Sequence, residues 1–158
     1  MPTSIPVSLL GKPSDDAEII ALISQGNGSA PKLPRGEVDA YVELKPLGVT
    51  LIFSDEGYHT ENSKLARGEG ALLLRSVLFF PEGYRDYAGF DGALPSGLTF
   101  AQNQAVTRSK MGAPEWENAN APAERWLVDG VRIWVRYTKA ADSIIQASMT
   151  QPRPSELS

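Results

Sequence analysis

The chain has 158 residues, 42% of them hydrophobic and 22% charged, and its formal net charge is −4 at neutral pH. This length suits one compact domain, or two small halves that share a hydrophobic core. The weakly acidic balance argues against nucleic acid as a partner, because proteins that bind nucleic acid usually carry a basic patch. The absence of cysteine excludes disulfide bonds, thiolate metal sites and cysteine nucleophiles.

Neither a membrane-spanning segment nor a secretion signal is predicted. Apolar runs such as residues 71–74 are far too short to cross a bilayer. Residues 1–13 lack the basic start and the long apolar stretch of a secretory signal. We therefore expect a cytoplasmic protein with no membrane partner. The polar residues 151–158, which include two prolines, are expected to form a frayed tail.

The first half of the chain predicts one helix followed by three strands. Ser14 is typical of a helix N-cap, and Asp15 and Asp16 would place negative charge in the first turn, where the helix dipole favours it. The helix is expected to end near Gly26, before a loop rich in glycine and proline. Residues 54–70 are polar and predict a long loop. The expected strands are residues 39–45, 49–53 and 71–80.

An aromatic, glycine-rich connection at residues 81–98 joins this half to the second one. Thr99 and Gln102 fit a capping box, in which the side chain of each residue bonds the backbone of the other, and they predict a helix that ends at Gly112. Asp-Gly at residues 129–130 predicts a two-residue hairpin turn, because both positions of that turn need a positive φ. The expected strands are residues 125–128, 131–138 and 143–149.

The two halves repeat the same order of features. LLGKP at 9–13 and KMGAP at 110–114 each follow a helix-like piece, and LGVTLIF at 47–53 and DGVRIWV at 129–135 each enter a strand through a glycine turn. This order predicts an α+β fold of two α-β-β-β units, whose antiparallel sheets pack as a pair or join edge to edge. Because one helix on three strands is marginally stable alone, each half should need the other. We expect one domain over residues 1–150, with pseudo-repeats at about 5–80 and 99–150 and a connection at 81–98.

Few residues suggest catalysis. His59, the only histidine, could act as a general base beside a carboxylate, but a histidine in a polar loop is more typically solvated. Asp86 and Asp91 lie among aromatic residues, which is compatible with a glycosidase-like cleft and, more simply, with turns. The sequence contains no P-loop, dinucleotide fingerprint, nucleophile elbow or zinc-protease motif. We therefore expect no enzyme activity, no cofactor and no metal.

Aromatic residues beside charged ones are the better candidates for a functional surface. Residues 115–117 place a tryptophan between two glutamates, and Trp134 shares one side of a predicted strand with Arg132 and Arg136. That strand side could stack a nucleic acid base, but Trp, Tyr and Arg are also the residues enriched in protein interfaces. The expected partner-binding residues are Tyr84, Asp86, Tyr87, Asp91, Glu115, Trp116, Glu117 and Trp134.

The motifs of the chain also resemble those of a known family. They are LLGKP, GVTLIF, GYRDYAGFDGALPSGLTF, KMGAP, RW and GVRIWVRY, and they extend from about Val7 to Met149. The set resembles small bacterial proteins that occur as immunity proteins beside polymorphic toxins and type VI secretion effectors. The tandem α-β-β-β pattern is also similar to β-lactamase inhibitor proteins, whose paired units present a concave sheet to an enzyme. The long segment 54–70 and the absence of cysteine depart from these patterns.

The resemblance implies an immunity protein, the antitoxin partner in bacterial competition. It would bind a cognate toxin or effector domain, block the active site of that domain, and be a monomer or a weak homodimer. A weakly acidic surface would speed the capture of a basic toxin. Two alternatives stay open: a small hydrolase that uses Asp86, Asp91 or His59, and a module that binds a peptide or small ligand on the strand side around Trp134.

Overall fold

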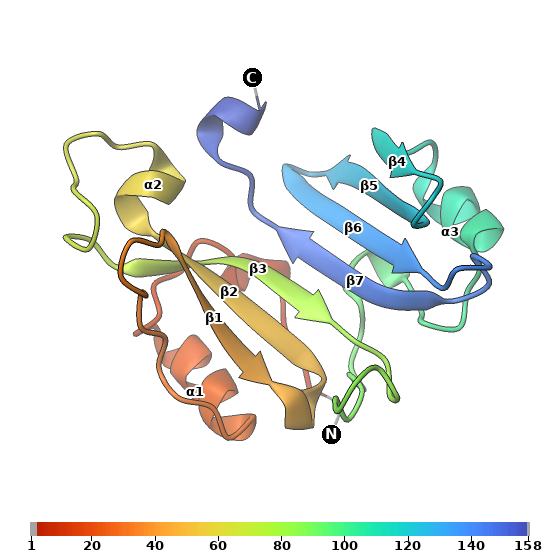
Figure 1. The fold of residues 1–158 in the computed structure, drawn as a ribbon, viewed down its shortest axis with the longest axis horizontal. Coiled ribbons are helices and arrows are strands. Elements are labelled where there is room, and N and C mark those ends of the chain that lie inside the picture. The colour runs from red at the N-terminus through yellow and green to blue at the C-terminus, as the bar shows by residue number, and fades with distance from the viewer. Residues whose placement is uncertain (1–2, 158) are drawn as a thin grey trace.

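Seven strands form one antiparallel sheet in the computed structural model, which describes residues 3–157 (Figure 1). The order across the sheet is β1-β2-β3-β7-β6-β5-β4, and together with the helices it confirms the predicted α+β class. The strands are β1 (Asp39–Leu44), β2 (Val49–Asp55), β3 (Leu72–Phe79), β4 (Trp116–Asn118), β5 (Ala123–Val128), β6 (Val131–Tyr137) and β7 (Ile144–Thr150). The helices are α1 (Ala17–Gln25), α2 (Glu56–Thr60) and α3 (Gln104–Met111), with the 3-10 turns η1 (Val7–Leu9), η2 (Lys45–Leu47), η3 (Pro95–Gly97) and η4 (Pro154–Leu157).

The two halves of the chain meet where β3 pairs with β7. Strands β1 to β3 form one meander and strands β4 to β7 form another, so their sheets are joined edge to edge. The joint is short, because only residues 76–79 of β3 pair with residues 147–150 of β7. The internal repeat itself stays a prediction, and the second half carries an extra short strand, β4, that the sequence did not predict.

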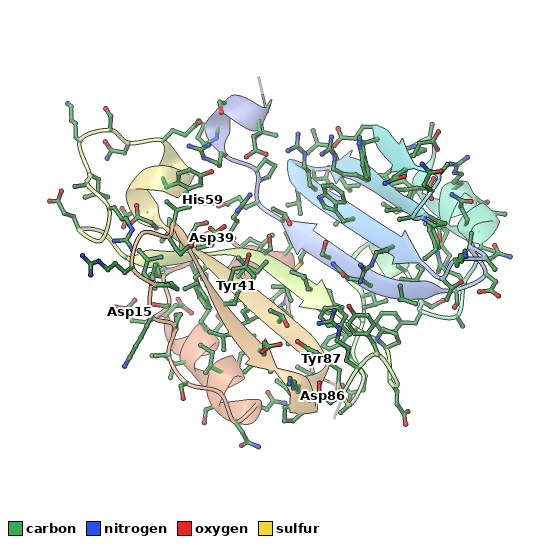
Figure 2. The ribbon with its side chains drawn as sticks, in the orientation of Figure 1. Asp15, Asp39, Tyr41, His59, Asp86 and Tyr87 are labelled. Atoms are coloured by element: carbon green, nitrogen blue, oxygen red, sulfur yellow. The ribbon has the colours of Figure 1, made fainter. Side chains whose placement is uncertain are left out.

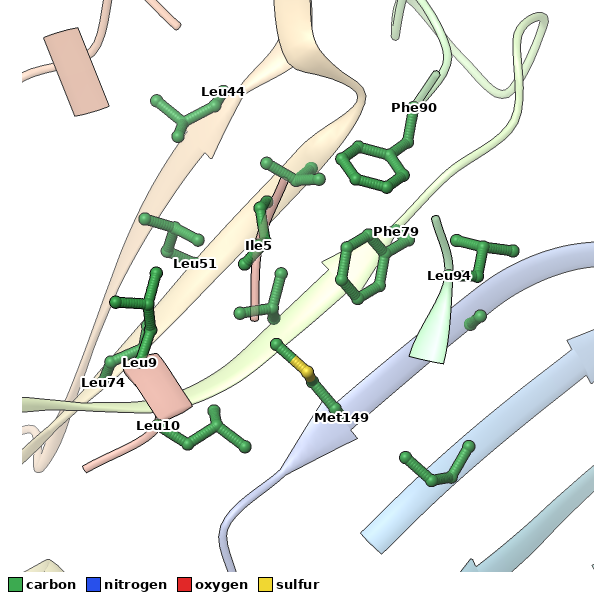
Figure 3. Close-up of a cluster of buried hydrophobic side chains, with 14 of the residues drawn as sticks. Ile5, Leu9, Leu10, Leu44, Leu51, Leu74, Phe79, Phe90, Leu94 and Met149 are labelled. Atoms are coloured by element: carbon green, nitrogen blue, oxygen red, sulfur yellow. The ribbon is translucent and has the colours of Figure 1, made fainter. Parts of the chain in front are cut away.

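The hydrophobic core covers one face of the sheet. One row of paired residues crosses six strands on this face, and every member of it is at most 6% exposed: Val42, Leu51, Val77, Met149, Ile133 and Trp126. Figure 3 shows Met149 of β7 beside Phe79 of β3, so the two halves share one core across their joint.

Helix α1 packs on the core face through Ile19, Leu22 and Ile23, which have the i, i+3, i+4 spacing of a buried helix side. Its N-cap is Asp16 and not the predicted Ser14: the Asp16 carboxylate accepts a hydrogen bond from the Glu18 backbone nitrogen at 2.9 Å. The helix ends at Gln25 with Gly26 as its C-cap, which confirms the predicted end near Gly26.

Helix α3 begins at Gln104, five residues after the predicted Thr99. Gln102 does accept a hydrogen bond from the Thr99 backbone nitrogen at 2.9 Å, as in a capping box, but this bond closes an isolated turn. The N-cap is Asn103, whose side chain accepts from the Val106 nitrogen at 2.9 Å. The predicted end at Gly112 is confirmed.

The polar segment 54–70 is not only a loop, because Ser54 and Asp55 end β2 and residues 56–60 form helix α2. Asp55 caps this helix by accepting from the Tyr58 nitrogen at 3.2 Å. The hairpin at 129–130 forms as predicted, with φ of 50° at Asp129 and 80° at Gly130. Within residues 3–157, no helix has the length and apolar character needed to cross a membrane.

The tail from residue 151 is bound to the domain instead of being frayed, up to the last described residue, Leu157. Arg153 Nε donates to the Tyr58 carbonyl at 3.0 Å, and its guanidinium lies 3.8 Å from the centre of the Tyr58 ring. Arg132 forms an ion pair with Glu156 at 2.6 Å. The tail therefore fixes α2 and the start of β6 relative to each other.

Candidate functional site

The face of the sheet opposite the core is open to a partner. On this side, a row of directly paired residues crosses all seven strands: Glu43, Thr50, Leu78, Ser148, Trp134, Arg125 and Trp116. A parallel row contains Tyr41, Ile52, Ser76, Thr150, Arg132 and Leu127. Because paired residues of a sheet share a face, these two rows, together with Arg136 and its paired residue Gln146, define what we call the open face.

Helices α1 and α3 both lie on the core side. The buried residues of α1 belong to the same cluster as Val42 and Leu51. Arg108 of α3 contacts Glu124, which alternates along β5 with the open-face residue Arg125. Antiparallel sheets commonly have one packed and one exposed face, and the exposed one is the natural binding surface here.

A hollow of about 290 Å³ lies on the open face at the joint between the two halves. Ser76 and Ser148 are its short side chains, 5% and 4% exposed, and the longer side chains of Trp134 and Arg136 help to line it. Ser76 and Thr150 share a hydrogen bond of 2.7 Å across the joint. The hollow is therefore built by both halves of the chain and exists only when they are assembled.

One end of the hollow is bordered by the aromatic connection. Tyr84 stacks on Phe80, with ring centres 4.6 Å apart, and Arg136 Nη2 donates to the Tyr84 hydroxyl at 3.0 Å. Tyr87, in contrast, is only 7% exposed and bonds Thr50 at 2.6 Å, so it supports Tyr84 and offers little contact area. Burial is the main cause that raises the pKa of Tyr87 above its ordinary value.

The other end of the open face carries a tryptophan pair. The rings of Trp116 and Trp134 lie 5.0 Å apart, and the Arg125 guanidinium lies within 6 Å of both, at 5.8 and 5.1 Å from the ring centres. Glu115 forms ion pairs with Arg125 at 2.9 Å and with Arg132 at 3.3 Å. The structure thus brings three of the predicted residues, Glu115, Trp116 and Trp134, into one cluster.

The other predicted acidic residues have partners within the chain. Asp86 forms an ion pair with Lys45 at 2.8 Å, and its hydrogen bond to Lys45 lowers the pKa of Asp86. Glu117 pairs with Arg108 at 2.5 Å. Asp91 is not part of this surface arrangement: it accepts a hydrogen bond from the Thr3 backbone nitrogen at 3.1 Å.

His59 is buried at 3% exposure and not solvated, because α2 turns it toward the tail, where its Nε2 lies 2.7 Å from Gln151 Oε1. Figure 2 shows His59 and Asp86 at opposite ends of the first half of the sheet, so these two hydrolase candidates do not meet. Within the described residues 3–157, no group of three His, Cys, Asp or Glu side chains could hold a metal ion.

Sequence reasoning missed most of the hollow. It recognised that Arg136 shares a strand side with Trp134, because alternation along β6 is a local signal. It missed Ser76, Gln146 and Ser148, because these polar residues come together around the hollow only when β3 pairs with β7.

No family model, curated protein or solved structure matches the chain. The arguments for function therefore come from the geometry of the open face.

Proposed function

We propose that the protein is an immunity protein: it binds a cognate toxin or effector domain through the open face and blocks the active site of that domain. The observation that carries the proposal is the row of residues that crosses all seven strands, from Glu43 to Trp116, with no helix packed over it within residues 3–157. The motif resemblance supplies the class of partner. The compartment we propose is the cytoplasm, where such proteins neutralise toxins.

The composition of the open face fits a protein partner. Trp134, Trp116 and Tyr84 are large aromatic side chains whose positions are fixed by ring contacts, which lowers the entropy lost when they are covered. A standard interface buries about 800 Å² on each partner. The accessible surface of the protein is 8459 Å², so such an interface would cover about a tenth of it.

The mode of action follows from the shape of this surface. A sheet with many fixed hydrogen bonds is a rigid platform, and it can cover a catalytic cleft without reacting with anything. Inhibition by this route needs tight binding and slow dissociation. It needs no cofactor or metal on the inhibitor.

Co-expression with the toxic domain encoded beside this chain tests the proposal. Cells that make both proteins should grow, and the two should elute together in gel filtration. Continued killing in the presence of the folded protein, with no complex detected, would refute it. The control is a toxic domain from an unrelated effector, which the protein should not neutralise.

A second candidate, a peptide- or small-ligand-binding module, is favoured by the hollow. Its volume of about 290 Å³ is near the lower limit of ~300 Å³ for small-molecule pockets. Trp134 lines it, so a ligand that enters should change tryptophan fluorescence. A saturable change with a small metabolite or a short peptide, in the absence of any toxin binding, would favour this candidate over the first. Among the described residues, no contact favours the hydrolase alternative.

A further inference from the structure

We propose that Arg136 is the anchor of the open face and that it takes a carboxylate, an Asp or Glu side chain on a protruding loop of the protein partner. The inference rests on the proposed function, because it assumes that the open face binds a protein. It adds the chemistry of the central contact: the partner presents negative charge at this point.

Arg136 lines the hollow and is held in place from two sides. It is half-buried, and its Nη2 donates to the hydroxyl of Tyr84 at 3.0 Å. It pairs with Gln146 on one side and Ala123 on the other, so its backbone position is fixed by β7 and β5. A side chain that is already ordered loses little rotamer entropy when it binds, which is a property of interface anchors.

Arg136 differs from the other arginines of the open face in having no anionic partner. Arg125 has Glu115 at 2.9 Å and Arg132 has Glu156 at 2.6 Å. Arg75, a residue of β3 outside the two rows, has Asp39 at 3.1 Å. Within residues 3–157, no carboxylate oxygen lies within 4 Å of Arg136.

The hydrogen-bonding state of Arg136 is correspondingly incomplete. Its Nε is buried without a hydrogen-bond partner, and its only described hydrogen bond goes to a neutral tyrosine hydroxyl. The Nε atoms of Arg75, Arg125 and Arg132 also make no hydrogen bond of regular geometry, but each of those guanidinium groups has a carboxylate beside it. The Arg125 Nε itself lies 2.9 Å from Glu115. Arg136 is therefore the open-face cation whose charge is left to be neutralised from outside.

A carboxylate is the group that fits this position best. A guanidinium presents parallel N–H donors that match the two oxygens of a carboxylate, and such charge-assisted bonds are stronger than neutral ones. Gln146 and Ser148 lie in the same hollow, and their side chains can donate to an oxygen that enters it. Trp134 supplies an apolar wall that excludes water from the ion pair.

The inference changes the expected charge of the contact. The net charge of −4 suggests a basic partner, but Asp86, Glu115 and Glu117 all form ion pairs within the chain. The unpaired cation of the hollow therefore calls for a local acidic group on the partner, whatever the net charge of that partner.

The test compares three variants in binding to the toxic domain encoded beside this chain, by calorimetry. Arg136→Gln removes the charge and Arg136→Lys keeps it without the planar fork. Arg35→Gln is the matched control, since Arg35 is exposed in the loop before β1 and does not line the hollow. The Kd should rise about 30-fold or more for Arg136→Gln, by an intermediate factor for Arg136→Lys, and less than threefold for Arg35→Gln. Circular dichroism confirms that each variant is folded.

A second measurement does not depend on the toxin. Poly-L-glutamate and poly-L-lysine are titrated separately into the 15N-labelled protein, and the indole N–H signal of Trp134, assigned with Trp134→Phe, is followed. Poly-L-glutamate should shift this signal in the wild type and in Arg35→Gln but not in Arg136→Gln, and poly-L-lysine should not shift it.

The two measurements separate the two proposals. If the toxin binds the wild type and Arg136→Gln equally well, the proposal that Arg136 anchors the partner is wrong and the proposed function stands. If no toxin binds, the proposed function fails, and the titration alone decides the anchor: a shift that requires Arg136 supports it. Three results would overturn the proposal for Arg136: no shift of the Trp134 signal with poly-L-glutamate, a shift with poly-L-lysine, or a shift with poly-L-glutamate that Arg35→Gln abolishes as fully as Arg136→Gln does.

Discussion

Glu124 is a carboxylate with no exposed surface, and two side chains keep it hydrogen-bonded. The Tyr137 hydroxyl donates to it at 2.7 Å, and Arg108 Nε donates at 2.5 Å. When a buried carboxylate loses a hydrogen-bond donor, its desolvation free energy is no longer offset by that hydrogen bond, and the folded state is destabilised. The network therefore fixes α3 and β6 against β5, on the side of the sheet away from the open face.

Tyr137→Phe tests this network, because it removes one donor to Glu124 and almost no volume. The free energy of unfolding in urea should fall by roughly 1–3 kcal/mol. Tyr41→Phe is the matched control: Tyr41 is 66% exposed on the edge strand, and its loss should change stability by less than about 0.5 kcal/mol. Equal effects of the two changes would contradict the described role of Tyr137.

The same tyrosine predicts a dependence on alkaline pH. Burial, with the hydrogen bond and charge of Glu124 acting in the same direction, raises the pKa of Tyr137 well above its ordinary value of 10.0. The unfolded chain then loses this proton at a lower pH than the folded one, so stability falls as the pH rises above about 10. The difference in unfolding free energy between wild type and Tyr137→Phe should shrink from pH 9 to pH 11. A constant difference would show that Tyr137 titrates normally.

At the scale of elements, the turn before β2 lies against the aromatic connection. Gly48 has φ of 75°, and a methyl carbon added to it would lie 2.2 Å from the backbone nitrogen of Phe90. Gly48→Ala should destabilise the protein more than Gly36→Ala, by roughly 1–3 kcal/mol. Gly36 has the same type of backbone, with φ of 82°, but open space around it, so it reports the cost of the positive φ alone. Equal losses in urea unfolding would mean that the connection can move away from the turn.

The bound tail is a second element with a testable contact. Hydrogen bonds from Ser155 are the main cause that lowers the pKa of Glu61, so the contact is present when Glu61 is ionised and weakens as the pH falls through its lowered pKa. The backbone amides of residues 153 and 155–157, with exchange expressed as protection relative to the intrinsic rate at each pH, should be protected at pH 7 and less protected at pH 3. Glu61→Gln should show the faster exchange already at pH 7. Slow exchange in this variant would show that Arg132 and Arg153 hold the tail alone.

Local signals explain which elements the sequence could predict. Alternation and the Asp-Gly turn located β5 and β6 to within two residues, because a hairpin is specified by neighbours along the chain. The predicted start of α3 was wrong because Thr99 and Asn103 are both suitable N-cap residues, and only tertiary contacts decide between them. The joint of β3 with β7 links residues more than 65 positions apart, so no local pattern could reveal it.

At the scale of the whole molecule, the one-sided sheet explains why the candidate site was only half predicted. Helices α1 and α3 cover one face, and the other face carries short polar residues at the joint and aromatic residues beside it. The aromatic connection and the tail touch this second face through Thr50 and Arg132. Aromatic composition alone pointed to Trp116, Trp134 and Tyr84, which lie on or beside the open face. The sequence could not show that Tyr87 and Asp91, which were also expected to bind a partner, are instead engaged within the chain, because their contacts with Thr50 and Thr3 depend on the tertiary path of the connection.

The most direct test of the account compares the two faces of the folded molecule in binding to the toxic domain encoded beside this chain. Trp134→Ala removes an open-face anchor, and Ile20→Ala removes a side chain that is 53% exposed on α1, on the opposite side. Trp134→Ala should raise the Kd about 30-fold or more, while Ile20→Ala leaves it unchanged. The opposite outcome, a loss with Ile20→Ala and none with Trp134→Ala, would place the binding surface on the helical side and contradict the account.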